Sequence, residues 1–339
     1  MNAPHDHHKA QLEPLRAALY DFDHNAVERA LRDIVHDNAL IQLGWPFETL
    51  ADTQALLERA YSPLASAWPD LERRDQIIIA GSCGSGAYWV GCCGYYLGTF
   101  ARPWLNIPPT QRPVAMRYHE FFRFVDERVV EIQAVWDIPE VMQQAGVWPL
   151  APALGREWRA PGPATQDGKD ATPRDAERSA ASVELVNRML IGLSRFAEGG
   201  AAAMELPRYW HPRCSWYGPS GIGTARGIDG FRMFHQIPFL NGMPDRVGSG
   251  DTGHLFGDND YVGFTAWPGM HMTLSGDGWL GVAPAGQPIT MRSLDFWRCE
   301  NGLIRENWVL IDLLDVFRQL GVDVLARMRE LSNPGLDAR

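Results

Sequence analysis

The chain has 339 residues, 45% of them hydrophobic and 21% charged, so it is long enough for two or three ordinary globular domains. Its net charge of −10 argues against the clustered basic surface that nucleic acids and anionic membranes require. The five cysteines form no CxxC pair, which favours free thiols in a reducing cytoplasm. The N-terminal residues lack the apolar run of a signal peptide, and no stretch approaches the ~18 apolar residues of a membrane span. We therefore expect a soluble cytoplasmic protein.

Tryptophan is unusually frequent, with 13 residues beside 14 Phe and 9 Tyr. Aromatic rings often line apolar ligand cavities, in which a few polar groups fix the orientation of the ligand. Large aromatic cores and a domain interface would explain the same count equally well. Composition alone leaves both interpretations open.

The first half of the chain predicts helices followed by strands. We expect a flexible tail over 1–10, whose HDHH run indicates no metal site. The spacing of apolar residues predicts a helix over 11–35 and a second helix over 49–68. Strands are expected at 86–100, 113–125 and 128–137.

The second half repeats this order after a segment without a core of its own. Residues 151–182 are rich in Pro, Gly, Ala and charge, which is typical of a linker laid across a surface. It would join a first domain at 11–150 to a second at 183–330, with a C-terminal tail at 331–339. In the second domain we expect helices at 182–206 and 227–243 and strands at 259–275, 288–300 and 303–312.

The chain matches itself at one constant offset of 175 residues, which pairs Asp137 with Asp312. Without any gap, 104–147 aligns with 279–322, and 14 of those 44 positions are identical. A period this long far exceeds the ~20–50 residues of a solenoid unit, so each copy should be a whole domain. Asn301-Gly302 lies between two strand-like runs and predicts a hairpin there. Helices followed by an antiparallel meander indicate the α+β class.

The second copy resembles the SnoaL-like polyketide cyclases and ester cyclases of the NTF2-like superfamily. The resemblance lies in HPRCSWYGPSGIGTARGIDGFRMFHQIPFLNGMPD at 211–245 and in MHMTLSGDGWLGVAPAGQPITMRSLDFWRCENGLIRENWVLIDLLDVFRQLG at 270–321, and it covers most of 183–325. The first copy is similar mainly through its 104–147 segment. The resemblance implies two tandem cone-shaped α+β barrels, in which a curved antiparallel sheet and helices enclose a cavity. It also implies binding of a small organic molecule and acid–base chemistry without metal or cofactor. Such domains often pair sheet to sheet, so we expect an intramolecular pseudo-dimer or a homo-oligomer.

Side chains alternate across a strand, which places candidate groups on one face. Met291, Ser293, Asp295 and Trp297 share a face of the second expected strand of the second copy. On the next strand a face carries Glu306, Trp308 and Asp312, and hairpin pairing should bring Asp295 beside Glu306 or Trp308. Corresponding acids in the first copy are Glu120, Glu131 and Asp137. Burial beside tryptophan would raise the pKa of such a carboxyl group and suit it to proton transfer.

The sequence departs from the cyclase pattern at the position that the resemblance assigns to the catalytic aspartate. Val309 stands there, three residues before Asp312, and Ala134 stands there in the first copy. A cavity histidine of the family corresponds to Asp295 and Glu120. The base has then moved to Asp295, or the activity is different or absent. Asp312 and Asp137 could equally serve as N-caps of the helices that follow them.

His235 and His271 occur only in the second copy, opposite Ala60 and Tyr96, and are candidates for proton partners of Asp295. Tyr217 and Arg226 flank a run of glycines and are expected to contact substrate. That run has no phosphate-binding spacing, and neither does GSCGSG at 81–86, so both are interpreted as tight loops.

We therefore predict a cofactor-free enzyme acting on a small carbonyl-bearing or aromatic metabolite, by cyclisation or isomerisation, or else by lyase or hydrolase chemistry. Its catalytic residues would be Asp295, His235, His271 and Asp312. Its substrate-binding residues would be Tyr217, Arg226, Trp297, Glu306, Trp308, Glu120, Glu131 and Asp137. A non-catalytic small-molecule binding protein is the alternative, and a third possibility is that the first copy serves only as a scaffold for the second.

Overall fold

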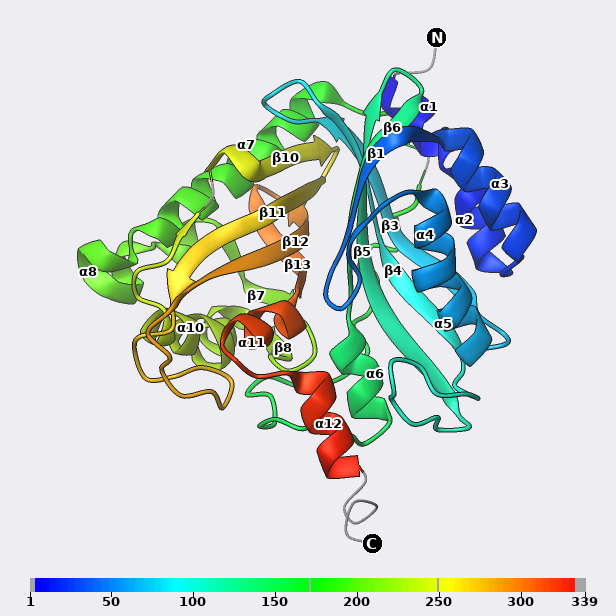
Figure 1. Ribbon diagram of the computed structural model, residues 1–339. Coiled ribbons are helices and arrows are strands. Elements are labelled where there is room, and N and C mark those ends of the chain that lie inside the picture. The colour runs from blue at the N-terminus through cyan, green and yellow to red at the C-terminus, as the bar shows by residue number, and fades with distance from the viewer. Residues whose placement is uncertain (1–3, 171, 249, 333–339) are drawn as a thin grey trace, which may run out of the picture.

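The computed structural model describes residues 4–170, 172–248 and 250–332. Two β-sheets pack against each other in the middle of the molecule, and most helices lie on their outer sides (Figure 1). The sheets belong to successive halves of the chain, so the duplication visible in the sequence is a duplication of domains. The α+β class and the tandem pair are confirmed.

The first domain begins with helices and ends with a helix after its last strand. Its helices are α1 Pro4–Gln11, α2 Glu13–Tyr20, α3 His24–Ile34, α4 Thr53–Leu56, α5 Ser62–Ala67 and α6 Ile138–Gln144, with a π-helical turn at Leu57–Tyr61. Its strands are β1 Val35–Leu43, β2 Glu48–Leu50, β3 Glu72–Ser82, β4 Tyr88–Thr99, β5 Pro113–Val125 and β6 Arg128–Trp136.

The second domain repeats this order. Its helices are α7 Ala176–Ser194, α8 Phe196–Ala203, α9 Gly227–Phe231, α10 Ile237–Gly242, α11 Leu313–Gln319 and α12 Val324–Ser332, with a π-helical turn at Arg232–Gln236 and 3-10 turns at Leu206–Arg208 and Gly250–Thr252. Its strands are β7 Trp210–Tyr217, β8 Thr224–Arg226, β9 Val247–Gly248, β10 Gly253–Asp258, β11 Tyr261–Thr273, β12 Pro288–Glu300 and β13 Leu303–Ile311.

Both sheets have the same strand order. The first runs β2-β1-β6-β5-β4-β3, and the second runs β8-β7-β13-β12-β11-β10, with the short β9 added beside β11. Each sheet holds one parallel pair, β1 with β6 and β7 with β13, and otherwise pairs antiparallel. The expected curved, mainly antiparallel sheets are therefore confirmed; each is open and contains one parallel pair. The order of strands is what makes the domains equivalent.

Seven of the described strands were not expected from the sequence: β1, β2 and β3 of the first domain, and β7, β8, β9 and β10 of the second. In β3 the first four residues, Glu72–Asp75, are all charged and show no alternation with apolar residues. Only Ile77–Ile79 form an apolar run. In β1 the polar residues at 36–38 likewise interrupt the alternation that marks a strand. Pairing with a neighbouring strand outweighs these weak local signals.

The N-terminal segment and the linker also differ from expectation. Residues 4–11 form α1, and His8 contacts the first sheet through the carbonyl oxygen of Asp126 at 3.0 Å, so this part of the expected tail is ordered. Helix α7 begins at Ala176, before the expected Ser182, because the side chain of Asp175 accepts hydrogen bonds from the amides of the first turn. The segment at 151–175 pairs Arg156 with Thr224 of the second domain, and its Gly168 carbonyl oxygen accepts a hydrogen bond from the Ile78 amide of the first.

A one-residue bulge near the tip of each hairpin sets which side chains share a face. In the second domain Cys299 pairs with Ile304 but Arg298 pairs with Glu306, so Arg305 is skipped. In the first domain the same shift skips Val130 between the pairs Phe124 with Val129 and Arg123 with Glu131. Because the side-chain period of a strand is two, one extra residue inverts the relation between the faces of the paired strands.

The two sheets meet through side chains on β5 and β12 that occupy equivalent positions. Phe121 stacks on Phe296, 175 residues later, with ring centroids 4.9 Å apart. Nδ1 of His119 donates to the carbonyl oxygen of Leu294, also 175 residues later, at 2.7 Å. Contacts between equivalent positions are expected where a pseudo-twofold axis passes. The interface therefore has the self-complementary geometry of a symmetric dimer within a single chain.

Two equivalent aspartates close this interface reciprocally. Asp137 of the first domain accepts a hydrogen bond from the Ser220 amide of the second at 2.9 Å. Asp312 of the second domain accepts one from the Trp45 amide of the first, also at 2.9 Å. Both pairs obey the 175-residue offset, since 45 and 220 correspond as 137 and 312 do. Each domain thus holds the same loop of its neighbour.

Within the described parts of the chain, none of the helices has both the length and the apolar character needed to cross a bilayer.

We predict that Phe296→Ala lowers the free energy of unfolding by about 3–5 kcal/mol, because it removes a fully buried ring at the axis and leaves a cavity against Phe121. Val125→Ala, at a side chain that is 50% exposed, should change it by less than about 0.5 kcal/mol. Denaturant titration followed by tryptophan fluorescence measures both. Equal stability of the two variants would contradict the importance of this contact.

Candidate active site in the second domain

A cavity of about 650 Å³ lies in the second domain between its helices and the face of its sheet that points away from the first domain. Strands β7, β12 and β13 and helices α7, α9 and α10 all contribute to it. Its walls are mainly aromatic, formed by Trp210, Trp216, Phe231, Phe239, Phe264 and Trp297. A mainly apolar cavity of this size fits a small organic molecule.

Asp295 lies on the floor of the cavity. The side chain is 7% exposed, and Ser293 Oγ donates to its Oδ2 at 2.6 Å. Burial raises the pKa of Asp295 to about 7, although hydrogen bonds from Ser293 and Asn307 act in the opposite direction. The carboxyl group therefore exchanges its proton near neutral pH, which is the range required of a general acid or base.

His235 lies in the cavity wall formed by the π-helical turn. Its ring stacks on Trp216 with centroids 4.1 Å apart and planes 12° from parallel. Burial lowers the pKa of His235 to about 3, so the imidazole is neutral at pH 7. A neutral imidazole keeps one N–H donor and one acceptor nitrogen, which suits it to orienting a ligand.

Four buried polar atoms of cavity residues have no hydrogen-bond partner within the described part of the chain. They are Trp210 Nε1, Trp297 Nε1, His235 Nδ1 and Gln236 Oε1. Leaving a buried polar group unpaired costs about 1–3 kcal/mol, so a polar partner for any of these atoms would stabilise the wall of the cavity. Two of the four are indole N–H donors, which can bind only an acceptor atom.

The first domain fills the corresponding space with side chains. Glu120, equivalent to Asp295, accepts hydrogen bonds from Arg73 Nη1 at 2.5 Å and from Tyr96 Oη and Trp136 Nε1 at 2.9 Å each. Ala60 stands where the second domain has His235. A carboxylate with all of these partners is fixed within a packed core. The two copies therefore differ in whether the acid faces a cavity.

The structure brings together only part of the predicted site. Asp295, Trp297 and His235 line the same cavity. Trp308 and Glu306 lie on the opposite face of the sheet, toward the first domain, and this corrects the expectation that they lie beside Asp295. The bulge at Arg305 is the reason, because it pairs Asp295 with Val309 instead of Trp308.

Glu306 instead belongs to a polar group at the domain interface. It accepts hydrogen bonds from Arg298 Nε at 2.6 Å and from Tyr217 Oη at 3.1 Å. Trp308 Nε1 donates to the Pro161 carbonyl oxygen in the linker at 2.9 Å. Tyr217 therefore also lies at the interface and outside the cavity wall, contrary to its expected contact with substrate.

The other expected residues lie elsewhere. His271 is exposed on β11, where Met270 holds the position equivalent to Tyr96, so the expected alignment was displaced by one residue. Arg226 is exposed and binds Ser215 Oγ at 2.7 Å. Glu131 pairs with Arg123 on the first sheet at 2.7 Å. None of these three side chains lines the cavity of the second domain.

Asp312 and Asp137 serve the domain interface. Asp312 also accepts from the amide of Asp315, as the N-cap of α11, and from Arg292 Nη1 at 3.0 Å. Burial raises the pKa of Asp312 to about 6, with Arg292 acting to lower it. Asp137 makes no side-chain cap hydrogen bond to α6. The expected capping role therefore fits Asp312 alone.

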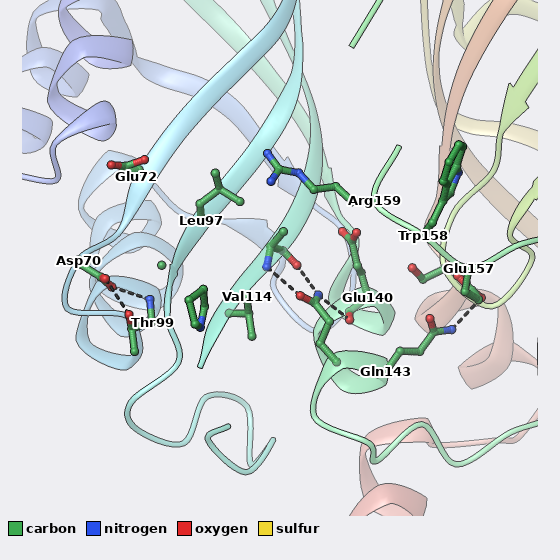
Figure 2. A pocket seen from close by; sticks show the side chains of 15 residues that line it. Asp70, Glu72, Leu97, Thr99, Val114, Glu140, Gln143, Glu157, Trp158 and Arg159 are labelled. Atoms are coloured by element: carbon green, nitrogen blue, oxygen red, sulfur yellow. Dashed lines mark hydrogen bonds between the residues drawn. The ribbon is translucent and has the colours of Figure 1, made fainter. Parts of the chain in front are cut away.

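A second hollow, of about 660 Å³, lies where the linker passes the first sheet (Figure 2). Glu140 and Glu157 face it, and burial raises the pKa of Glu140 to about 8, with Asp137 adding to the shift. Its polar groups are bound to one another: Asp70 to Thr99, and Glu157 to Gln143 and to the Gly221 amide. These hydrogen bonds make it a poorer candidate for ligand binding than the aromatic cavity.

Several cavity residues could not be identified from the sequence. Trp210 and Trp216 belong to β7, which lacked a clear strand pattern, and Asn307 enters the cavity face only because of the bulge. Gln236 is adjacent to His235 in the π-helical turn. The repeat offers one signal, namely positions at which the two copies differ in chemistry. The first copy carries the aliphatic residues Val35, Ile41 and Ile132 where the second carries Trp210, Trp216 and Asn307.

Comparison with known protein families finds one family that matches both domains. The family model for the SnoaL-like polyketide cyclase matches residues 14–145 and again 194–320. No curated protein matches the sequence significantly. Among solved structures, IdmH from Streptomyces antibioticus is 21% identical, with 40% of this chain and 96% of that chain covered and a TM-score of 0.34. AclR from Streptomyces galilaeus is 19% identical, with 43% and 85% covered and a TM-score of 0.36.

The two matched regions correspond to the two domains and together span most of the chain. Each contains the strands of its domain, the π-helical turn and the hairpin described above. The chain therefore belongs to the SnoaL-like polyketide cyclase family and carries two tandem copies of its domain.

Proposed function

We propose that the protein is a cofactor-free acid–base enzyme whose second domain alone is catalytic. Its substrate would be a small carbonyl-bearing or aromatic metabolite, and its reaction a ring closure or an isomerisation. The observation that carries this proposal is Asp295, a carboxyl group with a pKa near 7 at the floor of an aromatic cavity. Membership in the cyclase family supports the same class of chemistry.

Asp295 would remove a proton from a carbon next to a carbonyl group and return it elsewhere on the substrate. At pH 7 roughly half of the molecules hold it ionised and half protonated, so one group can serve both steps. Ser293 orients it through the 2.6 Å hydrogen bond. Proton abstraction places negative charge on the carbonyl oxygen, and the indole N–H groups of Trp210 and Trp297 are unpaired donors that could stabilise it.

His235 would orient the substrate as a neutral group. Its low pKa makes it a poor base at pH 7, whereas stacking on Trp216 fixes the plane of the ring. Nδ1 is free to accept a hydrogen bond from a hydroxyl group of the substrate, or to donate one to an oxygen atom in the other tautomer. This assigns His235 to positioning and Asp295 to proton transfer.

A non-catalytic binding protein is the second candidate, and Val309 favours it. Val309 replaces the aspartate that the family resemblance implies at this position, and it lies directly opposite Asp295 in the cavity. If Asp295 has not taken over the missing base, the cavity only sequesters its ligand. The two candidates separate on whether a bound metabolite is converted.

We predict that Asp295→Asn lowers turnover by at least about 100-fold, the lower range for loss of a general acid–base group. The matched control is Glu120→Gln, the same change at the equivalent position of the first domain, which should retain turnover. The assay incubates each protein with cell-extract metabolites and follows conversion of any bound compound by mass spectrometry. Binding without conversion by the unmodified protein would support the sequestering role, and loss of activity in Glu120→Gln alone would contradict the assignment to the second domain.

A second prediction concerns the pH dependence of turnover. If Asp295 acts as a base in the rate-limiting step, kcat should rise with pH and level off above about 7, where the carboxyl group is ionised. The residual rate of Asp295→Asn should lack this limb. A wild-type profile that is flat between pH 5 and 9 would remove Asp295 from the rate-limiting step.

A third prediction needs no substrate. The folded protein holds Asp295 with a pKa of about 7, above the ordinary value of 3.8, so folding becomes less favourable as pH rises between these values. Asp295→Asn removes this penalty, and its melting temperature relative to wild type should therefore increase from pH 5 to pH 8. Differential scanning calorimetry at both pH values measures it. A difference in melting temperature that stays constant between the two pH values would show that folding does not raise the pKa of Asp295.

A further inference from the structure

All five cysteines are buried, and four of them have thiols that remain protonated at neutral pH. Cys92 and Cys93 lie on β4, Cys214 on β7 and Cys299 on β12. Burial raises the pKa of Cys214 to about 11 and that of each of the other three to about 12. Thiols react as thiolates, so these four are unreactive at neutral pH.

Cys83 has a different environment, in the turn between β3 and β4. Its Sγ lies 3.0 Å from Ser85 Oγ and 3.6 Å from Nδ1 of His254, which belongs to β10 of the other domain. Burial alone would raise the pKa of this thiol, but the hydrogen bonds from His254 and Ser85 outweigh it and lower the pKa to about 6.

Two titratable groups on neighbouring elements are bound to other partners. Asp258, on the same strand as His254, binds Lys9 Nζ and the Ala80 amide at 3.0 Å each. His8, on α1, binds the Asp126 carbonyl oxygen. The ring of His254 packs on Trp89 with centroids 4.9 Å apart, which fixes its orientation beside the sulfur. His254 is therefore the imidazole that acts on Cys83.

The thiol lies beneath an exposed turn. Cys83 is 7% exposed, but the three residues that follow it, Gly84, Ser85 and Gly86, are all exposed. An atom added at the Cβ position of Gly84 or Gly86 would meet nothing within 4 Å. This open turn is therefore the route that a small reagent would take to the sulfur.

We propose that Cys83 and His254 form a thiol–imidazole pair across the domain interface, and that Cys83 is a modification site for small soft electrophiles. The thiol proton passes to His254 and from there to water, and the thiolate attacks an electrophilic carbon. A C–S bond forms, the bond to the leaving group breaks, and the oxidation state of sulfur does not change. Because the two residues come from different domains, the reactivity exists only when the interface is assembled. This function is separate from the cavity of the second domain.

Brief alkylation of the folded protein with iodoacetamide, followed by peptide mass spectrometry, tests the proposal. At pH 7 Cys83 should be labelled at least about tenfold faster than Cys92, Cys93, Cys214 or Cys299, because it alone is largely ionised. Its rate should level off above pH ~7, as the thiolate fraction saturates.

His254→Ala should move this midpoint toward pH ~8.5, the range of an ordinary thiol, which lowers the thiolate fraction at pH 7. The rate at pH 7 should fall only roughly three- to tenfold, because the thiolate of a thiol with a higher pKa is more nucleophilic. Circular dichroism checks that the variant is folded. Ser85→Ala provides a second variant with a smaller shift in the same direction should His254→Ala not fold. Labelling of Cys83 no faster than that of the other cysteines, or an unchanged pH profile in a folded variant, would overturn the proposal.

Discussion

The packing of β5 on β12 is the contact on which the rest of the structure depends. Phe121 and Phe296 stack at the pseudo-twofold axis, and the surrounding side chains of both sheets form one apolar layer. Burial of this layer is a large favourable term for two domains of this size. It also commits one face of each sheet to the interface. Only the opposite face remains available to enclose a ligand.

The two domains use that remaining face differently. In the first, Arg73, Tyr96 and Trp136 surround Glu120 and fill the interior. In the second, the equivalent Asp295 faces an aromatic cavity with few polar neighbours. A fully paired carboxylate stabilises a core, whereas poor solvation raises the pKa of a carboxyl group, so that it can exchange a proton near neutral pH. This difference supports a division of labour, in which the first domain provides the interface and the second provides the chemistry.

The interface also accounts for conspicuous residues that do not face the cavity. Asp137 and Asp312 hold equivalent loops of the opposite domain, and Glu306 joins Tyr217 to Arg298. Buried polar groups of this kind are satisfied by partners across the contact and fix the relative position of the domains. Duplicated acidic residues therefore mark the shared architecture, and the positions at which the copies differ mark the candidate site.

The sequence by itself determined the duplication, the α+β class and the family, because these depend on patterns spread over many residues. It also placed Asp295 and Trp297 on one face, since alternation along β12 is local. Only the tertiary structure decided which face of β13 meets them, because the bulge at Arg305 inverts that face and leaves no mark in the hydrophobic pattern. Likewise Cys83 and His254 are 171 residues apart, and only the packing of the two domains brings them together.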